Sequence, residues 1–223
     1  METLRASRRS LSAWVVFDAM GVVFTICDDT NDLLVPFIWE RNAAISREAI
    51  NEVYIRASLG QISSRRFWEE VGLGGQYPEV ETTYLDTRLT LDPEFGPVAR
   101  RLAERFSLGL LSNDLSEWSA YLRARHSLEF FDAVTISGDA GCRKPSPEIY
   151  ERFLADCGAR AEECVFIDDK LKNLAAAAGL GMKTIRFARQ PEESAFKPDA
   201  TIDTFARLEE AIGVLRDNGG RPG

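Results

Sequence analysis

The polar residues of this chain that are best suited to chemistry stand at or soon after the ends of short apolar runs. They are a carboxylate, a hydroxyl beside an amide, a cation and a pair of carboxylates: Asp18, Ser112 with Asn113, Lys144, and Asp168 with Asp169. A carboxylate can attack a substrate and form a covalent intermediate. A hydroxyl and an ammonium group can stabilise negative charge that develops on the substrate. The four groups can act together only if the fold brings them to one place.

The apolar runs before these groups predict the strands that would position them. Residues 14–17 are apolar and partly β-branched, which is typical of a strand buried on both faces of a parallel sheet. Further strands are predicted at 108–111, 133–136, 164–167 and 183–187, and helices at 93–105, 116–125, 147–157, 171–178 and 208–215. Alternating strands and helices imply βαβ units and a parallel sheet. Ligands bind beyond the carboxyl ends of such strands, so we expect all four groups at one edge of one sheet.

A long helical insertion separates the first predicted strand from the second. Residues 28–90 carry apolar residues at helical spacing and no convincing strand. We therefore predict an α/β fold: a Rossmann-like parallel sheet flanked by helices, with a small helical cap domain inserted after the first strand. The core domain would span residues 13–27 and 91–217, and the cap domain residues 28–90. The two ends, 1–12 and 218–223, are predicted to be disordered.

Composition excludes several classes of protein. The net charge of −8 argues against a nucleic-acid or membrane-surface partner, since both favour a basic patch. No apolar run approaches the ~20 residues that span a bilayer. The four cysteines lack CxxC spacing and the density of a secreted disulfide scaffold, which favours reduced thiols and a cytoplasmic location. His126 is the only histidine, which excludes zinc sites built on several histidines.

The order and context of the four groups resemble the haloacid dehalogenase superfamily of hydrolases. The matching stretches are Val16-Phe17-Asp18 with Gly21-Val22, Leu110-Leu111-Ser112-Asn113, Lys144-Pro145-Ser146-Pro147, and Phe166-Ile167-Asp168-Asp169 followed by Asn173 and Ala177-Gly179-Leu180-Gly181-Met182. They extend from residue 14 to about residue 187. A Ser-Asn or a Lys-Pro alone carries little weight, but four stretches in the right order, each at a predicted strand end, are specific.

The resemblance implies catalytic and substrate-binding roles. In the family the first aspartate, here Asp18, attacks the substrate and forms a covalent aspartyl intermediate. Ser112, Asn113 and Lys144 would bind the substrate, with the hydroxyl and the lysine holding phosphoryl oxygens. The lysine would also separate Asp18 from the later carboxylate pair.

The resemblance also implies a magnesium site. Its ligands would be Asp18, the backbone carbonyl of Met20, and one or both of Asp168 and Asp169. A small set of hard oxygen ligands, completed by water and a substrate phosphate, is what Mg²⁺ prefers.

Met20 departs from the pattern of the phosphatases in this superfamily. They usually carry a second aspartate two residues after the nucleophile, which protonates the leaving oxygen and then activates water. Methionine can do neither. Three explanations stay open: the substrate has a good leaving group, such as a sugar 1-phosphate, an acyl phosphate or a diphosphate; a neighbouring acid such as Asp28 or Asp29 substitutes; or the protein is not a phosphatase.

The sequence favours a phosphatase over two alternatives. Residues 17–21 also resemble the dehalogenase branch of the superfamily. Expelling halide needs no Mg²⁺, however, and that branch typically has Ser-Ser-Asn where this chain has Asp168 and Asp169. A non-catalytic ligand- or partner-binding homologue would also be expected to lose the nucleophile or the metal ligands, which this chain keeps. We predict a monomeric or homodimeric Mg²⁺-dependent hydrolase. Its substrate would be a small phosphorylated metabolite, because a helical cap closes over such a site and excludes water.

Overall fold

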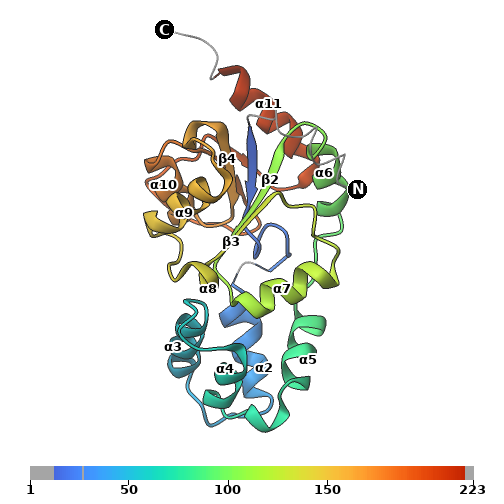
Figure 1. The fold of residues 1–223 in the computed structure, drawn as a ribbon, viewed down its shortest axis with the longest axis vertical. Helices are drawn as coiled ribbons and strands as arrows, with labels where there is room; N and C mark the ends of the chain where they lie inside the picture. Colours follow the sequence, from blue (N-terminus) through green and yellow to red (C-terminus); the bar gives the residue numbers. More distant parts are fainter. Residues whose placement is uncertain (1–12, 27, 219–223) are drawn as a thin grey trace.

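The computed structural model of this protein describes residues 13–26 and 28–218. Six parallel strands form one sheet in the order β3-β2-β1-β4-β5-β6. Their bounds are β1 Trp14–Phe17, β2 Ser107–Ser112, β3 Ala133–Ile136, β4 Cys164–Asp168, β5 Lys183–Phe187 and β6 Ala200–Ile202. The predicted Rossmann-like α/β fold is confirmed, and Figure 1 shows the sheet and its helices above a separate group of helices.

The first strand lies inside the sheet, between β2 and β4. Phe17 is in register with Leu110 of β2 on one side and with Ile167 of β4 on the other. The amide of Asp18, just beyond the strand, donates to the carbonyl of Ile167 at 2.9 Å. The carboxyl ends of β1, β2 and β4 therefore lie next to one another, and the residues that follow them share one edge of the sheet.

Helices cover both faces of the sheet. Successive side chains of each strand point to opposite faces, so neighbouring residues of β1 contact different helices. Val16 packs in a cluster with residues of α9 (Pro147–Cys157) and α10 (Leu171–Gly179). Val15 and Phe17 pack on the other face with residues of α6 (Phe95–Leu102) and α11 (Leu208–Asn218). The remaining helical elements of this part are α7 Ser116–Arg125, α8 Ser137–Ala140, η4 Ala161–Glu163 and η5 Phe205–Arg207.

The described residues between β1 and β2 form helices and connecting turns, apart from an isolated bridge between Phe24 and Leu91 and one between Met20 and Phe24. Before α6, the helical elements of this stretch are η2 Thr30–Leu34, α2 Val35–Trp39, α3 Arg47–Ala57, α4 Ser64–Glu70, η3 Gly74–Gln76 and α5 Glu79–Arg88. We call residues 30–88 the helical segment. Side-chain caps begin two of its helices, since Ser46 Oγ accepts from the amide of Ala49 and Ser63 Oγ from that of Arg66. The predicted division into two domains stays a prediction.

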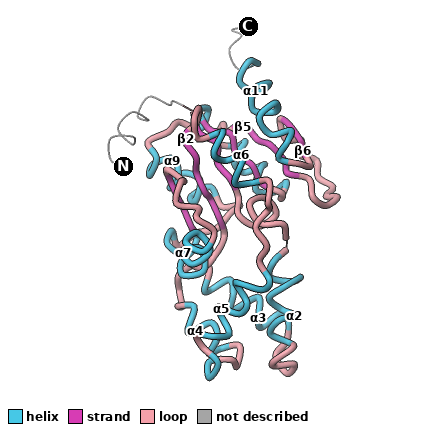
Figure 2. Tube along the Cα trace, turned by 90° about the vertical axis from the view of Figure 1, so that its right-hand side faces the viewer, coloured by secondary structure: helices cyan, strands magenta, loops and turns pink. Residues whose placement is uncertain are grey.

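Helix α7 ties the helical segment to the rest of the molecule. Its Trp118 packs against Phe67, Trp68 and Tyr84 of the segment, with ring centroids 5.3–5.9 Å apart. Trp68 and Trp118 also donate their indole N–H groups to the same oxygen of Glu81, at 2.9 and 2.7 Å. In Figures 1 and 2, α7 lies between the sheet and the segment. The segment is therefore anchored by a buried aromatic cluster as well as by its two connections.

Most predicted elements are found, some with the same bounds as predicted, such as α7, α9, β3 and β5. The short elements β6 and α8 were not predicted. The ends predicted to be disordered were 1–12 and 218–223. Residues 1–12 and 219–223 lie outside the described residues, whereas Asn218 is the last residue of α11, because the helix continues past the predicted boundary. Among the described residues, no helix is long and apolar enough to cross a membrane.

Candidate active site

Asp18 is buried at the carboxyl end of β1, and Lys144 reaches it from the loop after α8. Lys144 Nζ lies 2.7 Å from Asp18 Oδ1 and 2.8 Å from Asp168 Oδ2. No more than 10% of any of these three side chains is exposed. The fold thus brings three of the predicted site residues, distant in sequence, into direct contact.

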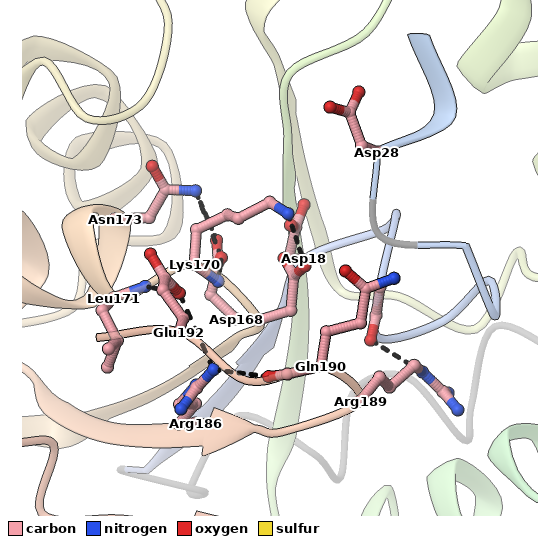
Figure 3. A network of polar contacts seen from close by, with 12 residues as sticks. Asp18, Asp28, Asp168, Lys170, Leu171, Asn173, Arg186, Arg189, Gln190 and Glu192 are labelled. Carbon is pink, nitrogen blue, oxygen red and sulfur yellow. Dashed lines mark hydrogen bonds and ion pairs between the residues drawn. The ribbon is translucent and has the colours of Figure 1, made fainter. Parts of the chain in front are cut away.

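Asp168 is the last residue of β4 and Asp169 follows it, and the two carboxylates have different partners; Figure 3 shows Asp168 beside Asn173. Both oxygens of Asp168 accept from the amide nitrogen of Asn173, at 3.1 and 3.0 Å, and Oδ1 also accepts from the backbone N–H of Lys170 at 2.8 Å. Asp169 Oδ2 lies 3.0 Å from Lys170 Nζ. One oxygen each from Asp18, Asp168 and Asp169 lies within 4.8 Å of the others, a grouping that can hold a metal ion.

Negative charge is in excess at this site. Burial, followed by the charge of Asp168, raises the pKa of Asp18 well above its usual value, although Lys144 acts in the opposite direction. Burial and Asp168 likewise raise the pKa of Asp169 to about 6. Burial acts to lower the pKa of Lys144, but the carboxylates of Asp168 and Asp18 outweigh it and the pKa stands above its usual value. A bound cation would relieve the remaining repulsion.

Ser112 is the last residue of β2 and Asn113 follows it, and the two side chains have different partners. The hydroxyl of Ser112 is buried and has no hydrogen-bond partner among the described residues. An unpaired buried hydroxyl costs about 1–3 kcal/mol, which a ligand oxygen can recover. The Asn113 side chain donates to the carbonyl of Lys144 at 2.9 Å and accepts from its N–H at 2.8 Å. This positioning of Lys144 was not predicted, and the predicted contact of Asn113 with substrate stays a prediction.

A cavity of about 290 Å³ opens beside these groups, between the sheet edge and the helical segment. Asp18, Ser112 and Lys144 line it from the sheet side, and Asn51 and Tyr54 line it from α3. The volume suits a small molecule. The groups that can react therefore face a space that the segment partly covers.

Met20 also lines this cavity and is only 8% exposed. A buried thioether therefore stands in the cavity wall at this position, and it can neither donate nor accept a proton. The predicted contact between its backbone carbonyl and a metal ion stays a prediction.

Three further residues of the site were missed from the sequence as functional. Asn173 holds Asp168, Arg143 lines the cavity and donates to Ser58 Oγ, and the Arg143 guanidinium lies 5.5 Å from the ring centre of Tyr54. Asn173 stood among the matched stretches and Arg143 stood next to Lys144, so each had a signal. Tyr54 had none, since its position depends on how α3 docks over the sheet.

The turn after β1 is bonded by Arg189 and packs closely against Asp169. Arg189 donates to the carbonyls of Gly21 and Val22 at 2.9 and 3.1 Å and pairs with Asp92 at 2.5 Å; Figure 3 shows Arg189 below the site. Gly21 has φ +85°, and a Cβ there would lie 2.5 Å from Asp169 Cγ. Only glycine allows this close approach.

We expect Gly21→Ala to destabilise the protein by about 1–3 kcal/mol or more, because alanine is strained at this φ and collides with Asp169. Urea unfolding at neutral pH measures the change. Gly213→Ala is the matched control: Gly213 lies inside α11, and a Cβ there meets nothing within 4 Å. That variant should gain about 0.5–1 kcal/mol. A Gly21→Ala protein as stable as the wild type would contradict the close packing of this turn.

A comparison with family models decides the family. The model described as haloacid dehalogenase-like hydrolase matches residues 13–181, most of the chain. The chain belongs to the haloacid dehalogenase-like hydrolases. The family that the four motifs resembled is thereby confirmed, and the stretch matched contains all the predicted site residues.

Curated and solved relatives agree with this assignment. The chain is 31% identical over 135 residues to a glyceraldehyde 3-phosphate phosphatase of Methanopyrus kandleri, and the match covers 56% of each chain, so it spans about half of that relative. A 2-haloacid dehalogenase from Pseudomonas syringae pv. Tomato DC3000 superposes with a TM-score of 0.68 at 21% identity, over 91% of this chain and 98% of that one. A family enzyme of Bacteroides thetaiotaomicron in complex with magnesium and inorganic phosphate gives 0.69 at 18% identity, over 82% and 97%. At such identities the two structures establish the shared fold alone.

Proposed function

We propose that this hydrolase is a Mg²⁺-dependent phosphatase that acts on a small phosphorylated metabolite through an aspartyl-phosphate formed on Asp18. The observation that carries the proposal is the cluster of three carboxylates, Asp18, Asp168 and Asp169, around one buried lysine and beside the unpaired hydroxyl of Ser112. A halide-displacing site has no need of so much negative charge, and a phosphoryl-transfer site needs it to bind a cation.

The residues present fit magnesium. They offer carboxylate oxygens, the hard ligands that Mg²⁺ prefers. The pKa values of Asp18 and Asp169 are raised by burial first and then by repulsion from Asp168, and a divalent ion would offset that repulsion. Both oxygens of Asp168 already bond to Asn173, and one also to Lys144. We therefore assign direct metal contact to Asp18 and Asp169, and to Asp168 the support of Lys144. A bound Mg²⁺ would neutralise charge on the phosphoryl group and so let a carboxylate approach it.

The chain's own groups would carry out the reaction around that ion. A carboxylate oxygen of Asp18 attacks phosphorus, the bond to the leaving oxygen breaks, and water then hydrolyses the acyl phosphate. The Ser112 hydroxyl, free to donate, would hold one phosphoryl oxygen. Lys144 would stabilise charge on the transferred group while it keeps Asp18 in place.

The cavity supports a small substrate. A volume of about 290 Å³ under the helical segment admits a phosphate with a short organic group and excludes a folded phosphoprotein. The curated relative named as a glyceraldehyde 3-phosphate phosphatase acts on a substrate of that size class, which supports the same class here.

Metal-dependent phosphate release tests the proposal. We expect purified protein to release phosphate from sugar 1-phosphates, acyl phosphates or ordinary phosphate monoesters in the presence of Mg²⁺, and to lose that activity with EDTA. It should release no halide from 2-haloacids. Halide release without phosphate release would favour the dehalogenase alternative.

The metal site can be tested without any turnover. We expect Asp169→Asn to weaken Mg²⁺ binding by about 10–100-fold or more, because it removes a charged ligand from a small set. Isothermal titration with Mg²⁺ measures this. Asp139→Asn, an exposed carboxylate on α8, controls for net charge and should bind as the wild type does. Unchanged binding in Asp169→Asn would remove Asp169 from the proposed ligand set.

A further inference from the structure

Methionine at position 20 can neither donate nor accept a proton, and the cavity itself offers two unassigned carboxylates. Asp28 and Asp29 both line the cavity that Asp18, Ser112 and Lys144 also line. They belong to the stretch of chain that enters η2 from the first strand. Either could in principle reach a leaving group that projects from the sheet edge toward the helical segment.

Asp28 is already engaged. Its Oδ1 accepts from the backbone N–H and the side-chain amide of Asn31, at 3.0 and 3.2 Å, and its Oδ2 accepts from the same amide at 3.1 Å. Figure 3 shows Asp28 on its own stretch of chain, across the site from Asp18 and Lys170. Hydrogen bonds of this kind help to begin a helix. Both side-chain oxygens of Asp28 are therefore already engaged by Asn31.

Asp29 differs from Asp28 in its surroundings. Asp29 is the N-cap residue of η2, but its side chain makes no capping hydrogen bond. Burial, followed by the charge of Asp28, raises its pKa to about 6, and Arg143 offsets this only in part. A carboxyl group with a pKa near the working pH can both give and take a proton.

The negative charge of Asp29 acts on three neighbouring groups. The pKa of Asp114, in the loop before α7, is raised well above its usual value, by burial first and then by Asp29. Burial raises the pKa values of Tyr54 of α3 and Tyr84 of α5 in the same way, with Asp29 as the next cause. Arg143 acts in the opposite direction on Asp29, Asp114 and Tyr54. Asp114 and the two tyrosines thus stay protonated at the pH at which Asp29 ionises.

We propose that Asp29, which lines the same cavity as Asp18, is the acid–base residue that takes the role of the aspartate absent at position 20. The assignment rests on the proposed phosphatase function. As Asp18 forms its bond to phosphorus, the carboxyl proton of Asp29 passes to the leaving oxygen, and the substrate departs as an alcohol. The Asp29 carboxylate then takes a proton from the water whose oxygen attacks phosphorus, and the bond between Asp18 and phosphorus breaks to release inorganic phosphate.

The dependence of rate on leaving group tests this role. General acid–base help is typically worth 10²–10⁴-fold and matters most for a poor leaving group. We expect Asp29→Asn to lower kcat/KM for glycerol 2-phosphate by about 10²-fold or more, and for p-nitrophenyl phosphate by less than about tenfold. Because hydrolysis of the acyl phosphate also loses its base, p-nitrophenol should appear as a burst equal to the enzyme concentration. In the wild type, kcat/KM for the alkyl ester should fall as the pH rises through about 6, and this fall should vanish in Asp29→Asn.

Matched variants separate this role from a structural one. Asp32→Asn, an exposed carboxylate on the same short helix, should leave both rate constants unchanged. In the double variant Asp29→Asn with Met20→Asp, a carboxyl at position 20 should restore turnover of glycerol 2-phosphate more than that of p-nitrophenyl phosphate. A loss of equal size for both esters, or a larger leaving-group-specific loss in Asp28→Asn, would overturn the assignment. If the wild type releases phosphate from neither ester, the proposed function is wrong and the assignment falls with it; if it hydrolyses both and Asp29→Asn does so equally well, only the assignment falls.

Discussion

Asp18→Asn should abolish turnover while leaving the fold intact. An amide is not a nucleophile, so no aspartyl-phosphate can form, and we expect kcat to fall by at least about 10⁴-fold. The structure gives no reason for the variant to unfold. Asparagine has the shape of aspartate, and Lys144 keeps its ion pair with Asp168 at 2.8 Å.

The stability of this variant has a predictable sign. Burial raises the folded-state pKa of Asp18. The protonated carboxyl therefore favours the folded state at pH values below the usual aspartate pKa, and this stabilisation is lost as the pH rises and the buried group ionises. In metal-free buffer at pH 7, Asp18→Asn should therefore be at least as stable as the wild type, and its relative stability should be lower near pH 4. Urea unfolding with EDTA at both pH values measures this. Residual turnover within tenfold of the wild type would remove Asp18 from the centre of the reaction.

The sequence predicts the parts of this fold that rest on local pattern. The strand at residues 133–136 and the helix at 147–157 match β3 and α9, because apolar spacing alone defines them. The strand β6 was missed because only Ile202 of its three residues is buried, so it shows no apolar run. Its place at the edge depends on pairing with β5, which is a tertiary contact.

In the candidate site as well, some features follow from local sequence pattern and others depend on tertiary contacts. The sequence predicts that Asp18, Lys144 and Asp168 share one edge because parallel strands all end there, and the structure brings them into contact. It does not predict that the Asn113 side chain holds the backbone of Lys144, since that bond joins two loops 31 residues apart. Nor does it predict that Arg143 lies close enough to Asp29 to affect its pKa, because only docking of the helical segment brings the two together.

Lys144→Met should be the most destabilising change at the site. The side chain is 1% exposed and balances two buried carboxylates, Asp18 and Asp168. Removing one member of a buried ion pair leaves an uncompensated charge and typically costs about 3–5 kcal/mol. Methionine preserves most of the buried length of lysine, so packing contributes little to the loss. We also expect kcat to fall by about 10²–10³-fold, because a stabilising charge is removed from the transferred group.

Lys170→Met provides the contrast in stability. Lys170 lies 3.0 Å from Asp169, but its side chain is 35% exposed. Water screens such a pair, so this variant should lose no more than about 1 kcal/mol. Urea unfolding in EDTA at pH 7 compares the two. Equal losses would mean that Lys144 is not the charge on which the buried carboxylates depend.

Acid should rescue Lys144→Met selectively. Lys144 acts to lower the pKa of Asp18, so the folded-state pKa of Asp18 should rise further when the ammonium group is removed. Groups with raised pKa values destabilise the fold at high pH and cease to do so as they take up protons. The deficit of the variant relative to the wild type should therefore shrink steadily from pH 7 to pH 5, and Mg²⁺ at pH 7 should reduce it as well, since it supplies positive charge to the same carboxylates. If the stability deficit of Lys144→Met stays constant with pH and with Mg²⁺, the loss of stability comes from packing. The buried carboxylates would then not depend on the charge of Lys144, although the proposed phosphoryl transfer at Asp18 requires that they do.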